Sequence, residues 1–320
     1  IYKYKIYTIL FTAFYFYLLI SSFFSNHIYF SLESSLLYFC YFIYTIAIIF
    51  IINKDNDTQK YILYFGYITF FIISLDAFYE IYTGYNIFNN SAMNGRISGM
   101  FGDRWVIGSY LVRLLPVLIG IFLINFYTLN KNIKYFIFFT SIMSIIVIVF
   151  SGERKAFLLL ILYAFLIFFY LFNKIKIFNI FMYLCFCIVL FLLPFAFNDY
   201  KERITQQVVH HISNTNVNEN QYLSMFKSSL EMFKDNLFFG VGPNNFRKEC
   251  FLEKYNLSHY SCNTHPHNTP LQLLAETGII GFIFVYGIFC YFIYKLFYLS
   301  RLNFNLKLFG IYSIICSIIM

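Results

Sequence analysis

Two histidines and an asparagine precede an apolar run near the end of the chain, and an imidazole is suited to proton transfer. His265, His267 and Asn268 are followed by Glu276, and the apolar run begins at the next residue. A neutral imidazole accepts a proton near pH 7, so His267 is the candidate general base at this junction of loop and helix. His265 is a candidate for orienting it or for binding an acceptor. The alternative role of His267 is to cap the helix that follows.

Arginines stand in connections between apolar segments, where a guanidinium can hold a phosphate. Its planar fork of N–H groups forms paired hydrogen bonds with phosphate oxygens. Arg154 lies at the start of an apolar helix, whose dipole adds positive potential there. Arg203 follows another apolar segment, and Arg96 lies in a glycine-containing loop. The alternative for Arg154 is a pair with Glu153 or with a lipid headgroup.

Three charged residues fall inside apolar segments, where an unpaired charge is costly. Asp76 and Glu80 are one helical turn apart and share a face, and Arg113 lies in the next apolar segment. We expect an ion pair between Asp76 and Arg113. The alternative is that these residues form a polar floor beneath a phosphate site.

The composition indicates that these residues belong to a membrane protein. The 320 residues are 60% hydrophobic and only 12% charged, whereas soluble domains are about 25% charged. A helix needs about 20 apolar residues to cross a membrane. The sequence therefore predicts an all-α polytopic protein with nine spans, over residues 6–24, 36–52, 61–82, 105–128, 135–150, 156–172, 177–197, 277–298 and 308–320.

Lysines mark every second connection between these spans, which by the positive-inside rule places those connections in the cytoplasm. The net charge of +8 is thus a topological signal and does not indicate nucleic-acid binding. The remaining connections face outward: 25–35, 83–104, 151–155 and 198–276. Five of the seven arginines lie in them: Arg96, Arg104, Arg154, Arg203 and Arg247. His267 and the candidate phosphate ligands therefore share one predicted face.

The outward connection 198–276 divides the chain into three expected parts. A bundle of seven membrane helices over 1–197 precedes it, and C-terminal membrane helices over 277–320 follow. The chain begins at Ile1 and ends within an apolar run, so we expect it to be part of a longer protein.

GVGP at 240–243 predicts a turn. Helical spacing predicts an amphipathic helix from about Glu219 to Asn236, on the membrane or over a site beneath it, with its apolar positions at Tyr222, Met225, Phe226, Leu230, Phe233 and Leu237.

Cys250 and Cys262 are the two of seven cysteines that lie outside the expected spans. In an oxidising compartment they could pair, and the bond would contribute on the order of 3 kcal/mol by closing a loop before the histidines. Two free thiols are equally compatible with the sequence. No His or Cys spacing is typical of a zinc site, so we expect neither a metal nor a cofactor.

The residues around His267 resemble the signature of the O-antigen ligase/polymerase superfamily, membrane enzymes that move glycans from a polyprenyl diphosphate carrier. The pattern is His-Asn, nine residues, then Gly-x-x-Gly, and it is formed here by His267, Asn268, Gly278 and Gly281.

Two arginine elements strengthen this resemblance. Arg154 and Leu158 are similar to the family's basic-x-x-x-Leu element. RISGMFG, which starts at Arg96, resembles its Arg-x-x-Gly-x-Phe-Gly element, although residues 103–105 (DRW) stand where the family commonly has Asn-Pro-Asn. Arg203 is similar in placement to a loop arginine that the family uses on the diphosphate.

The resemblance implies a glycosyltransferase of the bacterial inner membrane whose active site faces the periplasm. The donor would be a glycan on undecaprenyl diphosphate, and the acceptor a hydroxyl group of lipid A-core. His267 would accept the proton of that hydroxyl, while Arg154, Arg203 and Arg96 would bind the diphosphate. His265 and Asn268 would assist at the acceptor, and the two glycines would be structural. One inverting displacement would need no metal or nucleotide.

Other functions remain open at this stage. Polymerases that join repeat units and protein O-oligosaccharyltransferases share these sequence elements and differ in their acceptor. A transporter or flippase for a lipid-linked glycan would need charges through the membrane, for which only Asp76, Glu80 and Arg113 qualify. A non-catalytic scaffold would leave the outward arginines and histidines unexplained.

Overall fold

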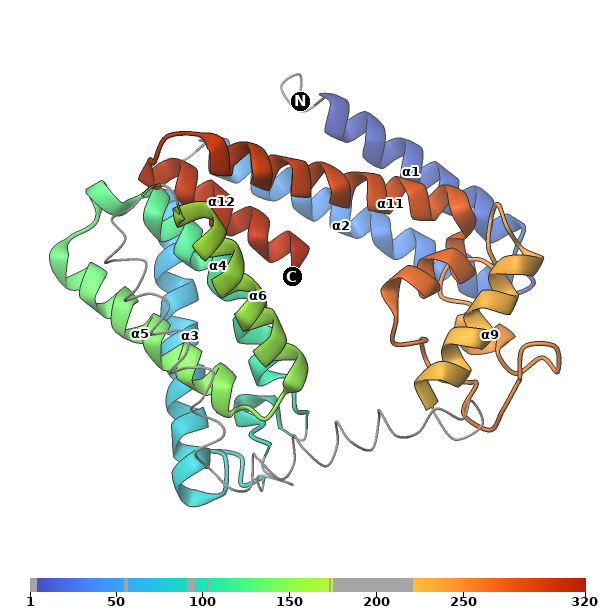
Figure 1. Ribbon diagram of the computed structural model, residues 1–320, viewed down its shortest axis with the longest axis horizontal. Coiled ribbons are helices and arrows are strands. Elements are labelled where there is room, and N and C mark those ends of the chain that lie inside the picture. Colours follow the sequence, from blue (N-terminus) through green and yellow to red (C-terminus); the bar gives the residue numbers. More distant parts are fainter. Residues whose placement is uncertain (1–4, 55–56, 91–95, 103, 173, 175–220) are drawn as a thin grey trace. The chain divides into compact units, whose positions relative to one another are not determined.

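The chain is built from helices, as expected for an all-α protein. A computed structural model describes residues 5–54, 57–90, 96–102, 104–172, 174 and 221–320 (Figure 1). Within these ranges the regular elements are α-helices and two short 3-10 helices, η2 (Gly99–Phe101) and η3 (Phe126–Thr128).

Eight apolar helices lie where spans are expected, and the chain is a multi-pass membrane protein. Six are long and apolar enough to cross a membrane: α2 (Ile28–Lys54), α3 (Thr58–Thr83), α4 (Ile107–Ile124), α5 (Lys131–Phe150), α6 (Arg154–Leu171) and α11 (Thr269–Arg301). Two more are shorter in their apolar part: α1 (Lys5–Phe23) and α12 (Leu306–Ile319). The expected span 177–197 lies outside the described residues, so the total of nine stays a prediction.

Two of these helices begin about eight residues earlier than expected. Their first turns are polar, so a search for runs of about 20 apolar residues does not include them. The start of α2 contains buried serines that bond to α1. Ser31 donates to the Ser22 hydroxyl at 3.1 Å, and the hydroxyl groups of Ser22 and Ser35 lie 2.8 Å apart. The start of α11 at Thr269 likewise precedes its apolar run by two turns.

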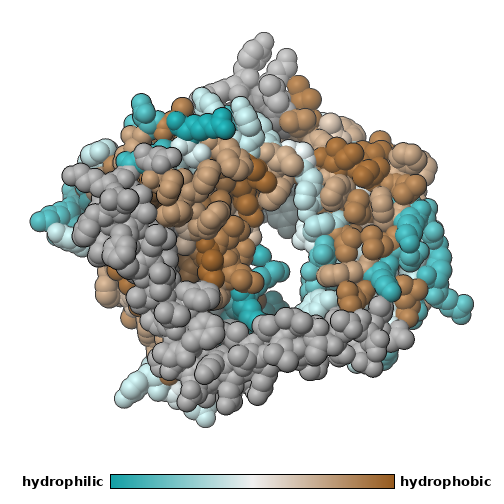
Figure 2. All heavy atoms as spheres, viewed as in Figure 1, coloured by the Kyte–Doolittle hydropathy of each residue, from teal (hydrophilic) through white to brown (hydrophobic). Residues whose placement is uncertain are grey.

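The chain divides into two compact units. Unit 1 contains Ile1–Lys54 and Val208–Cys290, and unit 2 contains Asp55–Gln207 and Tyr291–Met320. This grouping differs from the expected division at residues 197 and 276, which separates membrane segments from loop and stays a prediction. Figure 2 shows hydrophobic residues over the helices and hydrophilic residues gathered around α9 (Gln221–Asp235).

In unit 2 helices α4 and α12 approach closely through small residues, as is typical of membrane helices. A Cβ atom on Gly120 would lie 2.6 Å from the Gly310 carbonyl oxygen. Next to this crossing, the Ser313 hydroxyl donates to the carbonyl oxygen of Pro116 at 2.7 Å and lies 2.7 Å from the Tyr163 hydroxyl.

In unit 1 the expected amphipathic helix forms as α9, but it buries a face of mixed polarity. Met225 and Met232 pack on the short helix α10 (Phe246–Glu249) and on neighbouring loop residues. The serines between them are also buried, and the Ser228 hydroxyl donates to the Tyr255 carbonyl oxygen at 2.7 Å. Of the six apolar positions noted above, only Met225 is buried, whereas Tyr222, Leu230 and Leu237 are exposed.

Candidate active site

Helix α11 is broken at Gly278, the first glycine of the Gly-x-x-Gly element. Gly278 has φ 61° and ψ −169°, outside the helical region. A Cβ atom there would lie 2.3 Å from the Phe238 carbonyl oxygen, so only glycine fits. At the break the Ile279 N–H donates to the Leu237 carbonyl oxygen at 2.8 Å instead of to a carbonyl group of its own helix.

The segment 237–242 takes up most of the backbone groups that the break releases. The Ala275 carbonyl oxygen accepts from the N–H of Val241 at 2.8 Å, and that of Glu276 accepts from Gly242 at 3.0 Å. The Thr277 carbonyl oxygen accepts from the Tyr17 hydroxyl. The GVGP residues thus do more than form a turn. Two of their N–H groups bond to carbonyl groups of α11 just before the non-helical Gly278, where the helical hydrogen bonds are interrupted.

The second glycine of the element, Gly281, lies where α1 approaches α11. A Cβ atom on Gly281 would lie 2.3 Å from the Thr277 hydroxyl oxygen and 3.2 Å from the ring of Tyr17. The same tyrosine donates to the Phe238 carbonyl oxygen at 2.9 Å. Tyr17 therefore joins α1, α11 and the segment 237–242, although no sequence signal singles it out.

The cap of α11 is Asn268, and this leaves His267 outside the capping interaction. The Asn268 side-chain oxygen accepts from the Leu271 N–H at 3.1 Å, the standard cap geometry at a helix start. His267 is exposed and has φ 55°, a left-handed conformation that is uncommon for residues other than glycine. The cap bond at this helix start is thus formed by Asn268, the residue after His267.

The His267 ring is surrounded by other polar and aromatic side chains. Its Nε2 atom lies 3.3 Å from the side-chain nitrogen of Asn263, and its ring centre is 4.2 Å from that of His265. Tyr222 of α9 meets the ring edge-on, with centres 5.9 Å apart. The Asn263 side-chain oxygen accepts from the Thr264 N–H at 2.7 Å, so the amide nitrogen faces the His267 ring and donates to the lone pair of Nε2.

A disulfide bond fixes the loop that leads to these histidines. Cys250 and Cys262 are bonded, with their Cα atoms 5.2 Å apart, and this answers the question that the sequence leaves open. Next to Cys250, the buried Glu249 accepts from the Asn26 side chain at 3.0 Å. The disulfide bond thus ties the end of this loop, immediately before Asn263, to Cys250 next to α10. The Glu249 bond in turn ties α10 to the α1–α2 connection.

In unit 2, Glu153 does not pair with Arg154, because its carboxylate caps α4. It accepts from the N–H groups of Gly108 at 2.6 Å and Ser109 at 3.2 Å. Arg154 begins α6, is partly exposed, and makes no hydrogen bond or ion pair through its guanidinium with another described residue. Its charge is therefore not neutralised by the described part of the chain.

Arg96 lies in the loop before α4 and stacks on Trp105, with its guanidinium carbon 5.3 Å from the ring centre. Its buried Nε atom has no hydrogen-bond partner among the described residues. Because Glu153 bonds to the start of α4, the loop that holds Arg96 and the start of α6 belong to the same end of unit 2.

The expected ion pair between Asp76 and Arg113 does not form. Arg113 is exposed on α4, whereas Asp76 is buried and accepts from the Ile87 N–H at 2.9 Å. Glu80 accepts from the N–H groups of Ser98 at 3.1 Å and Gly99 at 2.6 Å. Both carboxylates thus hold the backbone of the connection between α3 and α4, an interaction that a search for opposite charges misses.

The described residues leave some candidate ligands untested. Arg203 lies outside the described residues. His267 belongs to unit 1, and Arg96 and Arg154 belong to unit 2. Within the described ranges, no group of three or more His, Cys, Asp or Glu side chains is placed to hold a metal ion.

The helices and the two sets of polar residues define a multi-pass membrane protein with candidate sites for proton transfer and for anion binding. Residues 139–286 match the family model of the O-antigen ligase domain (Wzy_C), which confirms the resemblance seen in the sequence. The match includes Arg154, Arg203 and the His-Asn element, while Arg96 precedes it. No curated protein and no solved structure matches the chain. The family implies a glycosyltransferase-like ligase or polymerase activity on lipid-linked glycans.

Proposed function

We propose that this protein transfers a glycan from undecaprenyl diphosphate to lipid A-core at the periplasmic face of the bacterial inner membrane. The observation that carries the proposal is the setting of His267 within the family domain. Asn268 takes the capping role, and the imidazole stands exposed on a loop that a disulfide holds. An exposed imidazole at such a position is available to an acceptor hydroxyl group.

The proposed reaction is one displacement at the anomeric carbon. The acceptor oxygen forms the new bond to that carbon, and its proton passes to His267. The bond from the anomeric carbon to the phosphate oxygen breaks, and its electron pair leaves with the diphosphate. Attack opposite the leaving group inverts the configuration, and the step as written consumes no metal or nucleotide.

The leaving diphosphate requires cationic ligands. Arg154 fits the role of a diphosphate ligand because the described residues do not neutralise its guanidinium. It is also the first residue of α6, and a helix start favours anions. Arg96 has an unused buried N–H group, and Arg203 is assigned by the resemblance alone. Preorganised donors of this kind stabilise the charge that develops in the transition state.

The experiment uses purified protein with undecaprenyl-diphosphate glycan and lipid A-core in the presence of EDTA. Glycosylated lipid A-core is the expected product. Longer glycan on the carrier would instead identify a polymerase, and transfer to a supplied acceptor protein would identify an oligosaccharyltransferase. A donor that stays intact with every acceptor, yet crosses a vesicle membrane, would contradict the proposal and indicate a transporter.

A further inference from the structure

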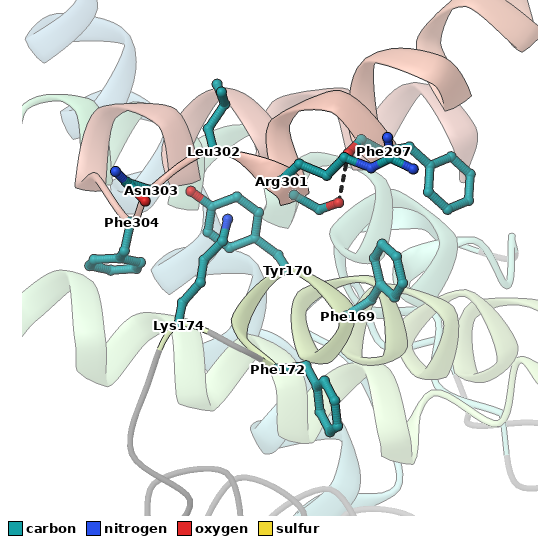
Figure 3. A pocket seen from close by; sticks show the side chains of 10 residues that line it. Phe169, Tyr170, Phe172, Lys174, Phe297, Arg301, Leu302, Asn303 and Phe304 are labelled. Carbon is teal, nitrogen blue, oxygen red and sulfur yellow. Dashed lines mark hydrogen bonds between the residues drawn. The ribbon is translucent and has the colours of Figure 1, made fainter.

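A pocket of about 690 Å³ opens in unit 2 at the end of α6 opposite Arg154 (Figure 3). It is bounded by the last turn of α6, the last turn of α11 and the connection 302–304 that leads to α12. The 18 residues of α6 separate it from Arg154 by about 27 Å at 1.5 Å per residue. The lysine pattern assigns this end to the cytoplasm, so the pocket is distinct from the candidate active site.

Among the described residues, two cations and no carboxylate line the pocket. Lys174 follows α6 and extends toward α11 (Figure 3), where its ammonium group donates to the Leu299 carbonyl oxygen at 3.3 Å. It also lies 3.4 Å from the centre of the Tyr170 ring. Burial lowers the pKa of Lys174, because a charged amine is less stable away from water.

The second cation, Arg301, lies exposed at the end of α11, and its guanidinium makes no hydrogen bond or ion pair with another described residue. Beside Lys174, the Tyr170 side chain is buried, and its hydroxyl group donates no hydrogen bond to another described residue. The pocket thus offers N–H and O–H donors together with positive charge that the chain does not balance.

The remaining wall is aromatic. Phe169, Phe172, Phe297 and Phe304 surround the polar groups. The pocket lies at the end of membrane-spanning helices, where aromatic residues meet lipid headgroups and the start of acyl chains. Soluble phosphate would use the cations and gain nothing from this ring, whereas a phospholipid matches both features.

We propose that this pocket binds the phosphate headgroup of an anionic membrane lipid, with Lys174 and Arg301 as its ligands and the phenylalanines against its acyl chains. Basic pockets between membrane helices on the cytoplasmic side commonly bind such headgroups. The site is independent of glycan transfer, and its test does not measure that reaction.

The test is native mass spectrometry and thermal unfolding of the full chain in a neutral detergent. Phosphatidylglycerol, phosphatidylcholine and inorganic phosphate are added separately. We expect phosphatidylglycerol to bind and to raise the unfolding temperature, with phosphatidylcholine and phosphate ineffective. The double variant Lys174→Gln, Arg301→Gln should lose about tenfold or more in phosphatidylglycerol affinity. Arg301→Gln alone should fold normally, since Arg301 has no described internal partner, and should lose part of the affinity.

The matched control is Lys295→Gln, Lys307→Gln, which removes two charges from the same end without touching the pocket lining. Its affinity for phosphatidylglycerol should stay within about twofold of the wild type, because neither lysine lines the pocket. The loss of one charged contact or more would lower the affinity by about tenfold. Equal losses in the two double variants would overturn the proposal in favour of diffuse attraction. Equal binding of phosphatidylcholine, or of inorganic phosphate, would also overturn it.

Discussion

At the residue scale, the candidate base and the cap of α11 are two neighbouring residues. His267 and Asn268 are adjacent, and the asparagine side chain bonds to the start of α11. The sequence suggests either role for the histidine, because residue type alone does not say which neighbour caps. The structure assigns a cap bond to Asn268, and it places the His267 ring beside Asn263 and Tyr222.

Replacing the cap should weaken α11 without altering any charge. Asn268→Ala should destabilise the protein by about 1 kcal/mol, because the Leu271 N–H loses its acceptor. Asn268→Ser keeps an oxygen at the cap and should unfold close to the wild type. Thermal unfolding in detergent measures both variants. A serine variant as unstable as the alanine variant would show that the asparagine acts in another way.

Arg154 is expected to stabilise the leaving diphosphate. Arg154→Ala should lower the turnover number for glycan transfer by about 10² to 10³, the usual effect of removing one preorganised donor. The control is Lys155→Ala, which removes an exposed positive charge one residue away and should keep nearly full activity. If the two variants lose activity equally, then Arg154 contributes only general positive charge.

At the scale of elements, the sequence predicts where helices lie better than it predicts how their ends are satisfied. Length and hydropathy are local, so eight of the expected spans appear as helices. The partners of the helix ends are distant: Glu153 caps a helix that begins about 45 residues earlier, and the segment 237–242 bonds across the break at Gly278. Such pairings depend on tertiary structure, and no spacing rule reveals them.

The break in α11 provides a direct test at this scale. Gly278→Ala should destabilise the protein by about 1–3 kcal/mol, because φ is positive and the added Cβ atom would overlap the Phe238 carbonyl group. In the same helix, a Cβ atom on Gly287 meets nothing within 4 Å, so Gly287→Ala should be neutral or stabilising. Unfolding temperatures that fall equally in the two variants would show that α11 is not fixed at this break.

At the scale of the whole molecule, the orientation of the helices decides which side of the membrane the candidate active site faces. The positive-inside rule places the end of α3 outside the cytoplasm and η3 inside it. Tyr82 and Tyr127 are exposed at these two positions. With the exposed Cys40 and Cys290 replaced by alanine, a membrane-impermeant maleimide should label Tyr82→Cys in intact spheroplasts and Tyr127→Cys only after lysis. The reverse pattern would turn the candidate active site toward the cytoplasm.

The sequence supplies His267, Asn268 and Arg154 as candidates from their spacing in the chain, and their roles in the reaction stay predictions. It fails for Asp76 and Glu80, because the rule for membrane charges looks for an opposite charge, whereas these carboxylates use backbone N–H groups. The acceptor is a further limit, since the His-Asn element serves several acceptors within the superfamily. Only the reaction products can distinguish them.

The most direct test of the account is the rate of glycan transfer to lipid A-core in His267→Ala compared with His259→Ala. His259 is exposed in the loop that the disulfide closes just before His267, and it has no role in the proposed reaction. Loss of a general base typically costs about 10² to 10⁴ in rate. We predict a loss of that size for His267→Ala and a nearly unchanged rate for His259→Ala. A His267→Ala variant that transfers glycan at the rate of the control would contradict the central claim.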